Sequence, residues 1–225
     1  MPAAFITGTG TGVGKTFVAT GLIHYYRRQG QPAAALKPIV SGFDPAASSG
    51  SDPALLLEAL GRDVNAHEVQ RISPWRYRAA LSPDMAARAE GRSIGFEAAA
   101  GFCRTAIAGT EGTLLIEGIG GVMVPLNSCR TVLDLMIALD LPVILVAGSY
   151  LGTLSHTLCA QDVILRHGLE LRAIVVSESE GAPPPLGETL TTLANFCAAP
   201  LIGLERKGPG AQSGAPFQRL AEFIG

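Results

Sequence analysis

The sequence carries little net charge, and it lacks paired cysteines and long apolar runs. The formal net charge is −2 and the isoelectric point is about 6.1, so the molecule as a whole has no basic surface for nucleic acid or for an anionic membrane. No segment contains the roughly 18 uninterrupted apolar residues of a membrane-spanning helix. The N-terminal residues MPAAFITGTG lack the basic and apolar regions of a secretory signal. We therefore expect a soluble, cytoplasmic protein that acts on small molecules, with neither nucleic acid nor membrane as a partner.

Metal-binding and nucleophilic motifs are also missing. The cysteines are far apart and form no CxxC pair, which argues against a zinc site or a thioredoxin-type motif. They are Cys103, Cys129, Cys159 and Cys197, and we expect them to be buried free thiols. The histidines His24, His67, His156 and His167 show no metal-ligand spacing. Because no serine or cysteine lies in a convincing nucleophile setting, a hydrolase gains no support.

The pattern of apolar residues predicts the fold class. At 225 residues and 48% hydrophobic content the chain can bury one sizeable core. We see neither an internal repeat nor an interdomain linker, and we expect residues 1–225 to form a single domain. Short apolar runs alternate with stretches of helical periodicity, which indicates an α/β fold with a mainly parallel central sheet flanked by helices. In such a sheet, ligands bind outside the carboxyl ends of the strands.

The expected elements can be placed along the chain. The strands are Ala3–Thr7, Ala33–Lys37, Thr113–Glu117, Val143–Ala147, Ala173–Ser177 and Leu201–Leu204. The helices are Thr16–Arg28, Pro53–Leu60, Phe96–Ala108, Thr131–Leu139, Thr153–Arg166 and Glu188–Phe196, with Asp52, Asn127 and Ser128 as candidate N-caps. Residues Ser41–Ser51 and Gly181–Gly187 are rich in Gly, Ser, Asp or Pro, so we expect irregular surface loops there.

A glycine-rich loop follows the first expected strand and leads directly into a helix. It runs from Gly8 to Thr16 with the sequence GTGTGVGKT. Glycines let backbone N–H groups surround a phosphate, while a lysine balances its charge and a hydroxyl ligates Mg²⁺. The loop is one residue longer than the standard P-loop, and Val13 stands where a dinucleotide-binding GxGxxG motif needs glycine. An ordinary glycine-rich turn is the alternative, but the flanking strand and helix favour a three-layer P-loop NTPase-like fold.

Three charged residues can reach the same crevice. Glu117 closes an apolar strand, and an acid there is costly unless something pairs with it. Asp52 precedes a helix, where it is either a Mg²⁺ ligand or a simple N-cap. Lys37 ends the second expected strand, where it either points into the crevice or is a solvated strand-end charge. Together with the Thr16 hydroxyl, the two carboxylates are the candidate Mg²⁺ ligands.

The order and spacing of these motifs resemble the dethiobiotin synthetase family along nearly the whole chain. The matching segments are GTGTGVGKT, Lys37-Pro38-x-x-Ser41-Gly42, Ser51-Asp52, the run IEGIGG from Ile116 to Gly121, Leu151-Gly152-Thr153 with His156, and the run PLIG from Pro200 to Gly203. The resemblance implies formation of dethiobiotin from 7,8-diaminopelargonic acid, CO₂ and ATP, with Mg²⁺ as cofactor. A carbamate of the substrate attacks the γ-phosphate, and the second amine closes the ring on the resulting anhydride. The resemblance also implies a homodimer.

The resemblance assigns a role to each matching residue. Nucleotide contacts fall on Gly12, Val13, Gly14, Lys15, Thr16, Phe17, Asp52, Glu117, Gly118, Ile119, Gly120, Ser177, Glu178, Leu204, Glu205 and Arg206. Metal contacts fall on Thr16, Asp52 and Glu117. Substrate contacts fall on Thr11, Lys37, Ser41, Gly121, Gly152, Thr153 and Ser155, those after Leu151 lying across the dimer interface at the start of a helix. Lys15 and Lys37 are the expected catalytic residues, since they neutralise the charge in transfer.

The chain departs from the family pattern at several of these positions. Gly10 replaces an aspartate of the loop, Ser155 replaces an asparagine, and Asp84 stands where relatives have histidine. Ser177 stands where relatives have the asparagine that reads adenine, and the segment after Leu204 is shortened. Because a hydroxyl cannot present the paired donor and acceptor of an amide, we predict weaker discrimination among nucleotide bases.

Two other functions fit the loop less well. A partner-regulated P-loop ATPase switch of the chromosome-partitioning type shares this fold, but its second lysine early in the loop is missing. The nearest thing to a basic cluster, Arg71, Arg76 and Arg78, is interpreted as a solvated loop face. Amide-forming relatives such as cobyrinate diamide synthetase carry a glutaminase domain, for which 225 residues leave no room.

Overall fold

The computed structural model describes residues 2–179, 184–206 and 214–225. Its larger sheet has six strands in the order β2-β5-β1-β6-β7-β8, and every neighbouring pair is parallel. The bounds are β1 (Ala3–Gly8), β2 (Ala33–Leu36), β5 (Thr113–Glu117), β6 (Val143–Gly148), β7 (Leu171–Ser177) and β8 (Leu201–Leu204). The predicted α/β class and all six predicted strands are therefore confirmed. Four strand ends shift by one or two residues: β1 and β6 extend to Gly8 and Gly148, β7 begins at Leu171, and β2 ends at Leu36, so that Lys37 follows it.

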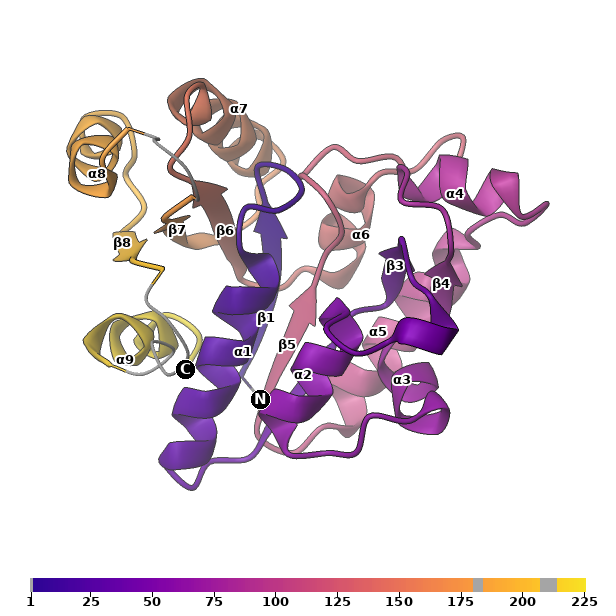
Figure 1. Cartoon of the computed structure of the whole chain (residues 1–225). Coiled ribbons are helices and arrows are strands. Elements are labelled where there is room, and N and C mark those ends of the chain that lie inside the picture. The colour runs from indigo at the N-terminus through magenta and orange to yellow at the C-terminus, as the bar shows by residue number, and fades with distance from the viewer. Residues whose placement is uncertain (1, 180–183, 207–213) are drawn as a thin grey trace.

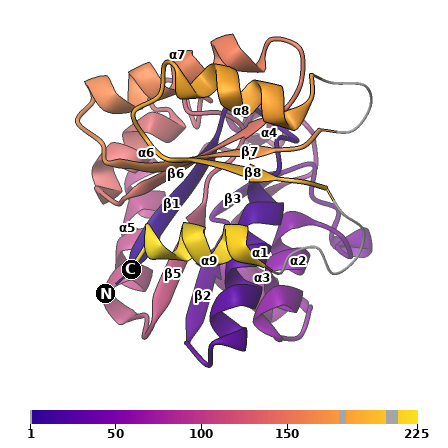
Figure 2. The ribbon, with the colours of Figure 1, turned by 90° about the vertical axis from the view of Figure 1, so that its left-hand side faces the viewer.

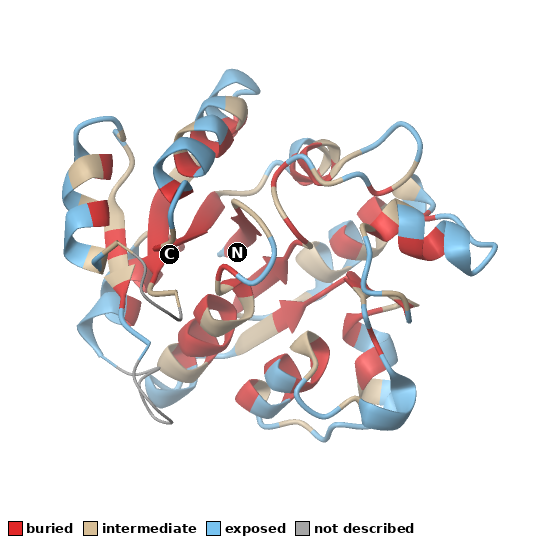
Figure 3. Ribbon diagram, turned by 45° about the horizontal axis from the view of Figure 1, so that its top comes forward, coloured by how far each residue is buried: buried red, intermediate tan, exposed pale blue. Residues whose placement is uncertain are grey.

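The central strands are continuous apolar runs because helices cover both faces of the sheet. Every residue of β1, β5 and β6 is buried, and Figure 3 shows buried residues filling the strands while the outer faces of the helices are exposed. Two helices, α7 (Thr153–Arg166) and α8 (Leu186–Ala194), lie on one face of the sheet. On the other face lie α1 (Lys15–Arg28) and α9 (Ala215–Glu222), as Figure 2 shows. This arrangement confirms the predicted three layers.

The remaining helices include the other predicted ones, with small shifts at their ends. They are α2 (Asp52–Leu60), α3 (Ala66–Ile72), α4 (Pro83–Ala89), α5 (Phe96–Gly109) and α6 (Val132–Leu139) (Figure 1). The predicted N-caps were wrong. Ser51, not Asp52, caps α2 by accepting from the Ala54 N–H. Thr131, not Asn127 or Ser128, caps α6, because Thr131 and Asp134 form a capping box.

Several short elements were not predicted. They are α3, α4, α9, the short helix η1 (Pro45–Ala47), and a two-stranded parallel sheet of β3 (Ile39–Ser41) and β4 (Trp75–Tyr77). The expected irregular loop Ser41–Ser51 thus contains η1, and α8 begins inside the other expected loop, at Leu186. Positions 181–183 of that loop lie outside the described residues.

Two further expectations concern the surface. Within the described ranges, no helix is long and apolar enough to cross a bilayer. The cysteines are free, as expected, but the expectation that all are buried was wrong. Cys103 is buried, Cys197 is half-buried, and Cys129 and Cys159 are exposed.

Candidate nucleotide and metal site

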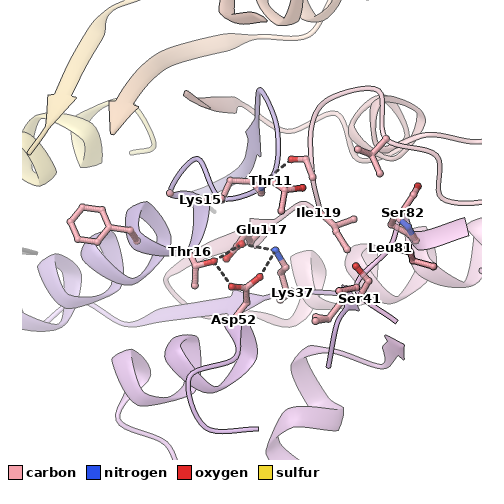
Figure 4. Close-up of a pocket in the computed structure, with 18 of the residues that line it drawn as sticks. Thr11, Lys15, Thr16, Lys37, Ser41, Asp52, Leu81, Ser82, Glu117 and Ile119 are labelled. Atoms are coloured by element: carbon pink, nitrogen blue, oxygen red, sulfur yellow. Dashed lines mark hydrogen bonds and ion pairs between the residues drawn. The ribbon is translucent and has the colours of Figure 1, made fainter. Parts of the chain in front are cut away.

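A cavity of about 720 Å³ opens at the carboxyl ends of β1 and β5. Its lining comes from the glycine-rich loop, from Lys37 and Ser41 beside β3, from the start of α2 and from the residues after β5. The expected residues Thr11, Gly12, Gly14, Lys15, Thr16, Phe17, Lys37, Ser41, Asp52, Glu117, Ile119, Gly120 and Arg206 all line it. Figure 4 shows that the side chains of Lys37, Asp52 and Glu117 converge on one point of this cavity. This is the strand edge at which a parallel sheet is expected to bind ligands.

The glycine-rich loop turns directly into α1. Gly14 caps that helix with φ 102°, and Gly12 has φ 73°, both in the left-handed region that side chains rarely adopt. A Cβ on Gly14 would also lie 2.8 Å from the Ser177 hydroxyl oxygen. The turn therefore requires glycine at Gly14, and it aims the free N–H groups of the first turn of α1 into the cavity.

Lys15 joins the two loops that border the cavity. Its ammonium donates to the Gly10 carbonyl at 2.7 Å and to the Gly120 carbonyl at 2.8 Å. Burial and the neighbouring charge of Lys37 lower the pKa of Lys15 from 10.5 to about 8. A buried cation of this kind is well suited to an anionic ligand, since the ligand's charge would favour the protonated form.

Four side chains from distant parts of the chain form one polar cluster. The Lys37 ammonium lies 2.6 Å from Glu117 Oε1 and 3.1 Å from Asp52 Oδ2. The Thr16 hydroxyl lies 2.8 Å from Asp52 Oδ1 and 2.9 Å from Glu117 Oε1. Lys37 and Glu117 are buried, at 2% and 1% exposure. The structure rejects two of the alternatives left open by the sequence, since Ser51 rather than Asp52 caps α2 and Lys37 is not a solvated charge.

Burial and ion pairing shift the pKa values of the two carboxylates in opposite directions. Burial raises the pKa of Glu117, with the negative charge of Asp52 adding to the effect, although Lys37 opposes it. The pKa of Asp52 is lowered, because Lys37 and the Thr16 hydroxyl outweigh its partial burial. For Lys37, burial opposes the charged form, but the two carboxylates outweigh it and raise the pKa. The cluster is therefore an ion-paired group with its cation in place.

The donor set of the cluster fits a divalent ion such as Mg²⁺. Thr16 has a single hydroxyl proton for two carboxylate oxygens, and the buried Glu117 Oε2 has no hydrogen-bond partner. Hydroxyl and carboxylate oxygens are the ligands Mg²⁺ prefers, and it commonly takes one or two carboxylates together with waters and phosphate oxygens. No group of three or more His, Cys, Asp or Glu able to hold a metal occurs in the described ranges. An all-protein cage is therefore absent there, and Thr16, Asp52 and Glu117 could hold a nucleotide-bound ion.

A second cavity of about 680 Å³ adjoins the first one. Phe17 and Arg206 line both cavities, and Glu178, Leu204 and Glu205 line the second. Glu178 accepts a hydrogen bond from the Arg206 N–H at 2.9 Å, which holds the end of β8 against the end of β7. Ser177 lies elsewhere. Its hydroxyl is buried behind Gly14, has no hydrogen-bond partner, and lines neither cavity.

The residues expected to contact the substrate are divided among three places. Thr11, Lys37 and Ser41 line the first cavity, whereas Gly121 lines a third cavity of about 480 Å³ with Thr11 and His156. Gly152, Thr153 and Ser155 lie at the start of α7 and line none of these three cavities. Val13 and Gly118 also line none of them, but Gly118 accepts from Lys37 at 2.8 Å and Val13 packs near Gly8.

Sequence reasoning missed part of the first cavity's lining. Val40, Val124 and the segment Ala80–Leu81–Ser82–Pro83 also line it. The Ser82-Pro83 pair could have indicated a helix start in this segment, since Ser82 precedes α4 and Pro83 is its first residue.

The comparisons agree with this geometry. The family model described as an AAA domain matches residues 3–204. The chain is 46% identical to the ATP-dependent dethiobiotin synthetase BioD of Acidiphilium cryptum, over 88% of this chain and 90% of that protein. It is 51% identical to the BioD of Caulobacter vibrioides strain NA1000, over 87% and 88%. The BioD of Pseudomonas aeruginosa strain UCBPP-PA14 is 38% identical over 94% of each chain.

Solved structures support the fold alone. The signal recognition particle receptor FtsY of Elizabethkingia anophelis superposes with a TM-score of 0.56 at 14% identity. That match covers 100% of this chain, while this chain spans only 65% of the FtsY chain. On the sequence matches, which cover nearly the whole length of each relative, the chain belongs to the dethiobiotin synthetases, a family of ATP-dependent ligases.

Proposed function

We propose that this protein forms dethiobiotin from 7,8-diaminopelargonic acid, CO₂ and ATP, releasing ADP and phosphate. The observation that carries the proposal is the cluster of Thr16, Lys37, Asp52 and Glu117 beside the glycine-rich loop, in a cavity of about 720 Å³. The relatives are ATP-dependent dethiobiotin synthetases by name, which supports the same reaction. We further infer that the chain acts as one domain in the cytoplasm.

The reaction needs charge neutralisation more than covalent chemistry. One amine of the substrate adds CO₂ as a carbamate, whose oxygen then displaces ADP from the γ-phosphate. The second amine attacks the resulting carbamic-phosphoric anhydride, and phosphate leaves as the ring closes. Phosphoryl transfer of this kind is accelerated chiefly by positioning and by fixed positive charge. Lys15 and Lys37, which both line the cavity, supply such charge.

Each group of residues has a distinct role in the proposal. The N–H groups from Gly12 to Phe17 bind the triphosphate, and Lys15 contacts its terminal oxygens. Thr16, Asp52 and Glu117 hold Mg²⁺, which, when bound, neutralises phosphate charge. Lys37 orients the carbamate, and Thr11 and Ser41 contact the substrate end. Gly118 to Gly121 allow the ligands to approach the backbone closely.

We propose that a second copy of the chain binds the far end of the substrate. Gly152, Thr153 and Ser155 lie outside the first cavity, yet they start a helix whose N–H groups favour a carboxylate. Leu151 next to them is 92% exposed. We propose a homodimer in which this helix start reaches the active site of the partner.

The base of the nucleotide lies in the second cavity in this proposal. Because Ser177 is buried behind Gly14, its hydroxyl is not available to the base there. Glu178, Leu204, Glu205 and Arg206 line that cavity instead. We therefore expect weaker discrimination among bases than an asparagine would give.

One experiment tests both the reaction and the base preference. The purified protein is incubated with the diamine, bicarbonate, Mg²⁺ and ATP, CTP or GTP in turn, while dethiobiotin is followed by mass and phosphate is measured. Dethiobiotin formed in step with phosphate supports the proposal, and comparable turnover with several nucleotides supports the inference about the base. A strict preference for ATP would contradict that inference. Phosphate released regardless of the diamine, without dethiobiotin, would favour the regulatory ATPase.

A further inference from the structure

We propose that the Lys37 ammonium is the resident cation of the metal site, and that divalent metal binding displaces it into the open cavity, where the substrate lies. The proposed function enters this inference at one point only, because it identifies the substrate as the molecule that the displaced ammonium contacts. Metal binding and the presentation of the catalytic ammonium are then one event rather than two.

The Lys37 ammonium is fully engaged by the residues that would hold the metal. Its three N–H groups face Glu117 Oε1 at 2.6 Å, the Gly118 carbonyl at 2.8 Å and Asp52 Oδ2 at 3.1 Å. Two of these three acceptors are carboxylates that also contact the Thr16 hydroxyl. In this arrangement Lys37 has no N–H left for a carbamate or a phosphate.

A metal ion and the ammonium compete for the same two carboxylates, Asp52 and Glu117. An ion bound by Thr16, Asp52 and Glu117 would lie about 2.1 Å from each ligand oxygen. Glu117 Oε1 is within hydrogen-bond distance of both Thr16 and Lys37, so an ion bound to Thr16 and this oxygen would share it with the ammonium. Glu117 is 1% exposed, and like charges at such short range repel strongly where water does not screen them.

The ammonium has somewhere to go. Lys37 lines the cavity of about 720 Å³, on the same floor as Thr11 and Ser41. Its long stem lets the ammonium swing toward these residues while the backbone stays fixed, since the Lys37 N–H donates to the Ile72 carbonyl and its own carbonyl accepts from the Ser73 hydroxyl. Lys15 is different, because it bonds two carbonyl oxygens and neither carboxylate.

Manganese binding to the nucleotide-free protein tests the competition. Mn²⁺ affinity is measured by the electron paramagnetic resonance signal of the free ion at about pH 7, without diamine or nucleotide. We expect Lys37→Met to bind one Mn²⁺ at least about tenfold more tightly than the natural protein, because its site has lost the competing ammonium. The double variant Lys37→Met/Glu117→Gln should lose this gain in Mn²⁺ affinity. That loss would show that the ion binds at Glu117.

Lys15→Met is the matched control, since it removes one positive charge from the same cavity without emptying the carboxylate cluster. We expect its Mn²⁺ affinity to rise by less than about threefold. An equal rise in both variants would show a general charge effect and overturn the proposal, as would no rise in Lys37→Met. Thermal unfolding of each variant shows that it is folded under the conditions used.

A second measurement uses the natural protein and depends on no variant for its outcome. The chain has only three lysines, Lys15, Lys37 and Lys207, so ¹⁵N-lysine labelling gives three side-chain signals. Saturating Mg²⁺ should shift the Lys37 ammonium signal and raise its exchange with water. A Lys37 signal unchanged by bound Mg²⁺ would overturn the proposal even if dethiobiotin is formed, and a shift without dethiobiotin would instead refute the proposed reaction.

Discussion

At the scale of single residues, Glu117 is the most sensitive position of the site. It is buried, it contacts both Thr16 and Lys37, and its second oxygen is unpartnered. Glu117→Gln keeps the size and one carbonyl oxygen but removes the charge, so we expect kcat to fall by about 100-fold or more and half-saturation to require more Mg²⁺. Steady-state kinetics over a series of Mg²⁺ concentrations measure both effects.

Asp162→Asn is the control for this change. Asp162 is exposed and pairs with Arg166 on α7, far from the cavity lining. The Asp162→Asn substitution should leave kcat unchanged. A Glu117→Gln enzyme with natural Mg²⁺ dependence would contradict the assignment of Glu117 as a metal ligand.

The cysteines should differ in reactivity according to their burial. Burial raises the pKa of Cys103 to about 12, and the thiolate is the reactive form. At about pH 8 a thiol reagent should therefore modify Cys129 and Cys159, which are exposed, and leave Cys103 unmodified until the protein unfolds. Peptide mass mapping after a short exposure checks this. Rapid labelling of Cys103 in the folded protein would contradict the described packing.

At the scale of elements, the turn into α1 depends on Gly14 far more than on Gly10. Gly14→Ala would place a Cβ at φ 102° and 2.8 Å from the Ser177 hydroxyl oxygen. The left-handed conformation alone costs about 1–2 kcal/mol, so we expect at least that loss in the free energy of unfolding and weaker ATP binding. Calorimetry and nucleotide titration measure the two quantities.

Gly10→Ala serves as the matched control in the same loop. An added Cβ at Gly10 has no atom within 4 Å, and Gly10 is not among the positive-φ residues. Its free energy of unfolding should change by less than about 0.5 kcal/mol. Equal effects of the two substitutions would show that the turn geometry is not the cause.

The elements also show how far the sequence could predict the structure. Strands such as Val143–Gly148 are unbroken apolar runs, and the glycine-rich loop, Lys37, Asp52 and Glu117 mark strand ends and a helix start, so these were identified. By contrast, α9 is held by Phe217 packing against Gly21, where a Cβ would come 2.2 Å from the ring. Such a contact joins residues far apart in sequence, and nothing local reveals it. Ser177 is likewise buried by a contact between residues far apart in sequence, since it packs behind Gly14.

At the scale of the whole molecule, the start of α7 is the exposed apolar surface that self-association would cover. Leu151 is 92% exposed and Leu154, one turn on, is 37% exposed. We expect Leu151→Asp to weaken self-association by about tenfold or more, because a buried interface does not tolerate an unpaired charge. Sedimentation velocity over a range of concentrations gives the change. Leu165→Asp, at the other end of the same helix and 50% exposed, should behave as the natural protein, and a monomeric natural protein would contradict the proposed dimer.

The position of β1 within the sheet has a consequence for synthesis of the chain. β1 leaves the ribosome well before the strands it pairs with, since β5 and β6 begin at residues 113 and 143. At roughly 5–20 residues per second, translation exposes this apolar strand for roughly 5–20 seconds before its first partner emerges. The nascent protein is therefore aggregation-prone during this interval, and a ribosome that stalls before residue 113 leaves a fragment that cannot pair the strand preceding its phosphate loop.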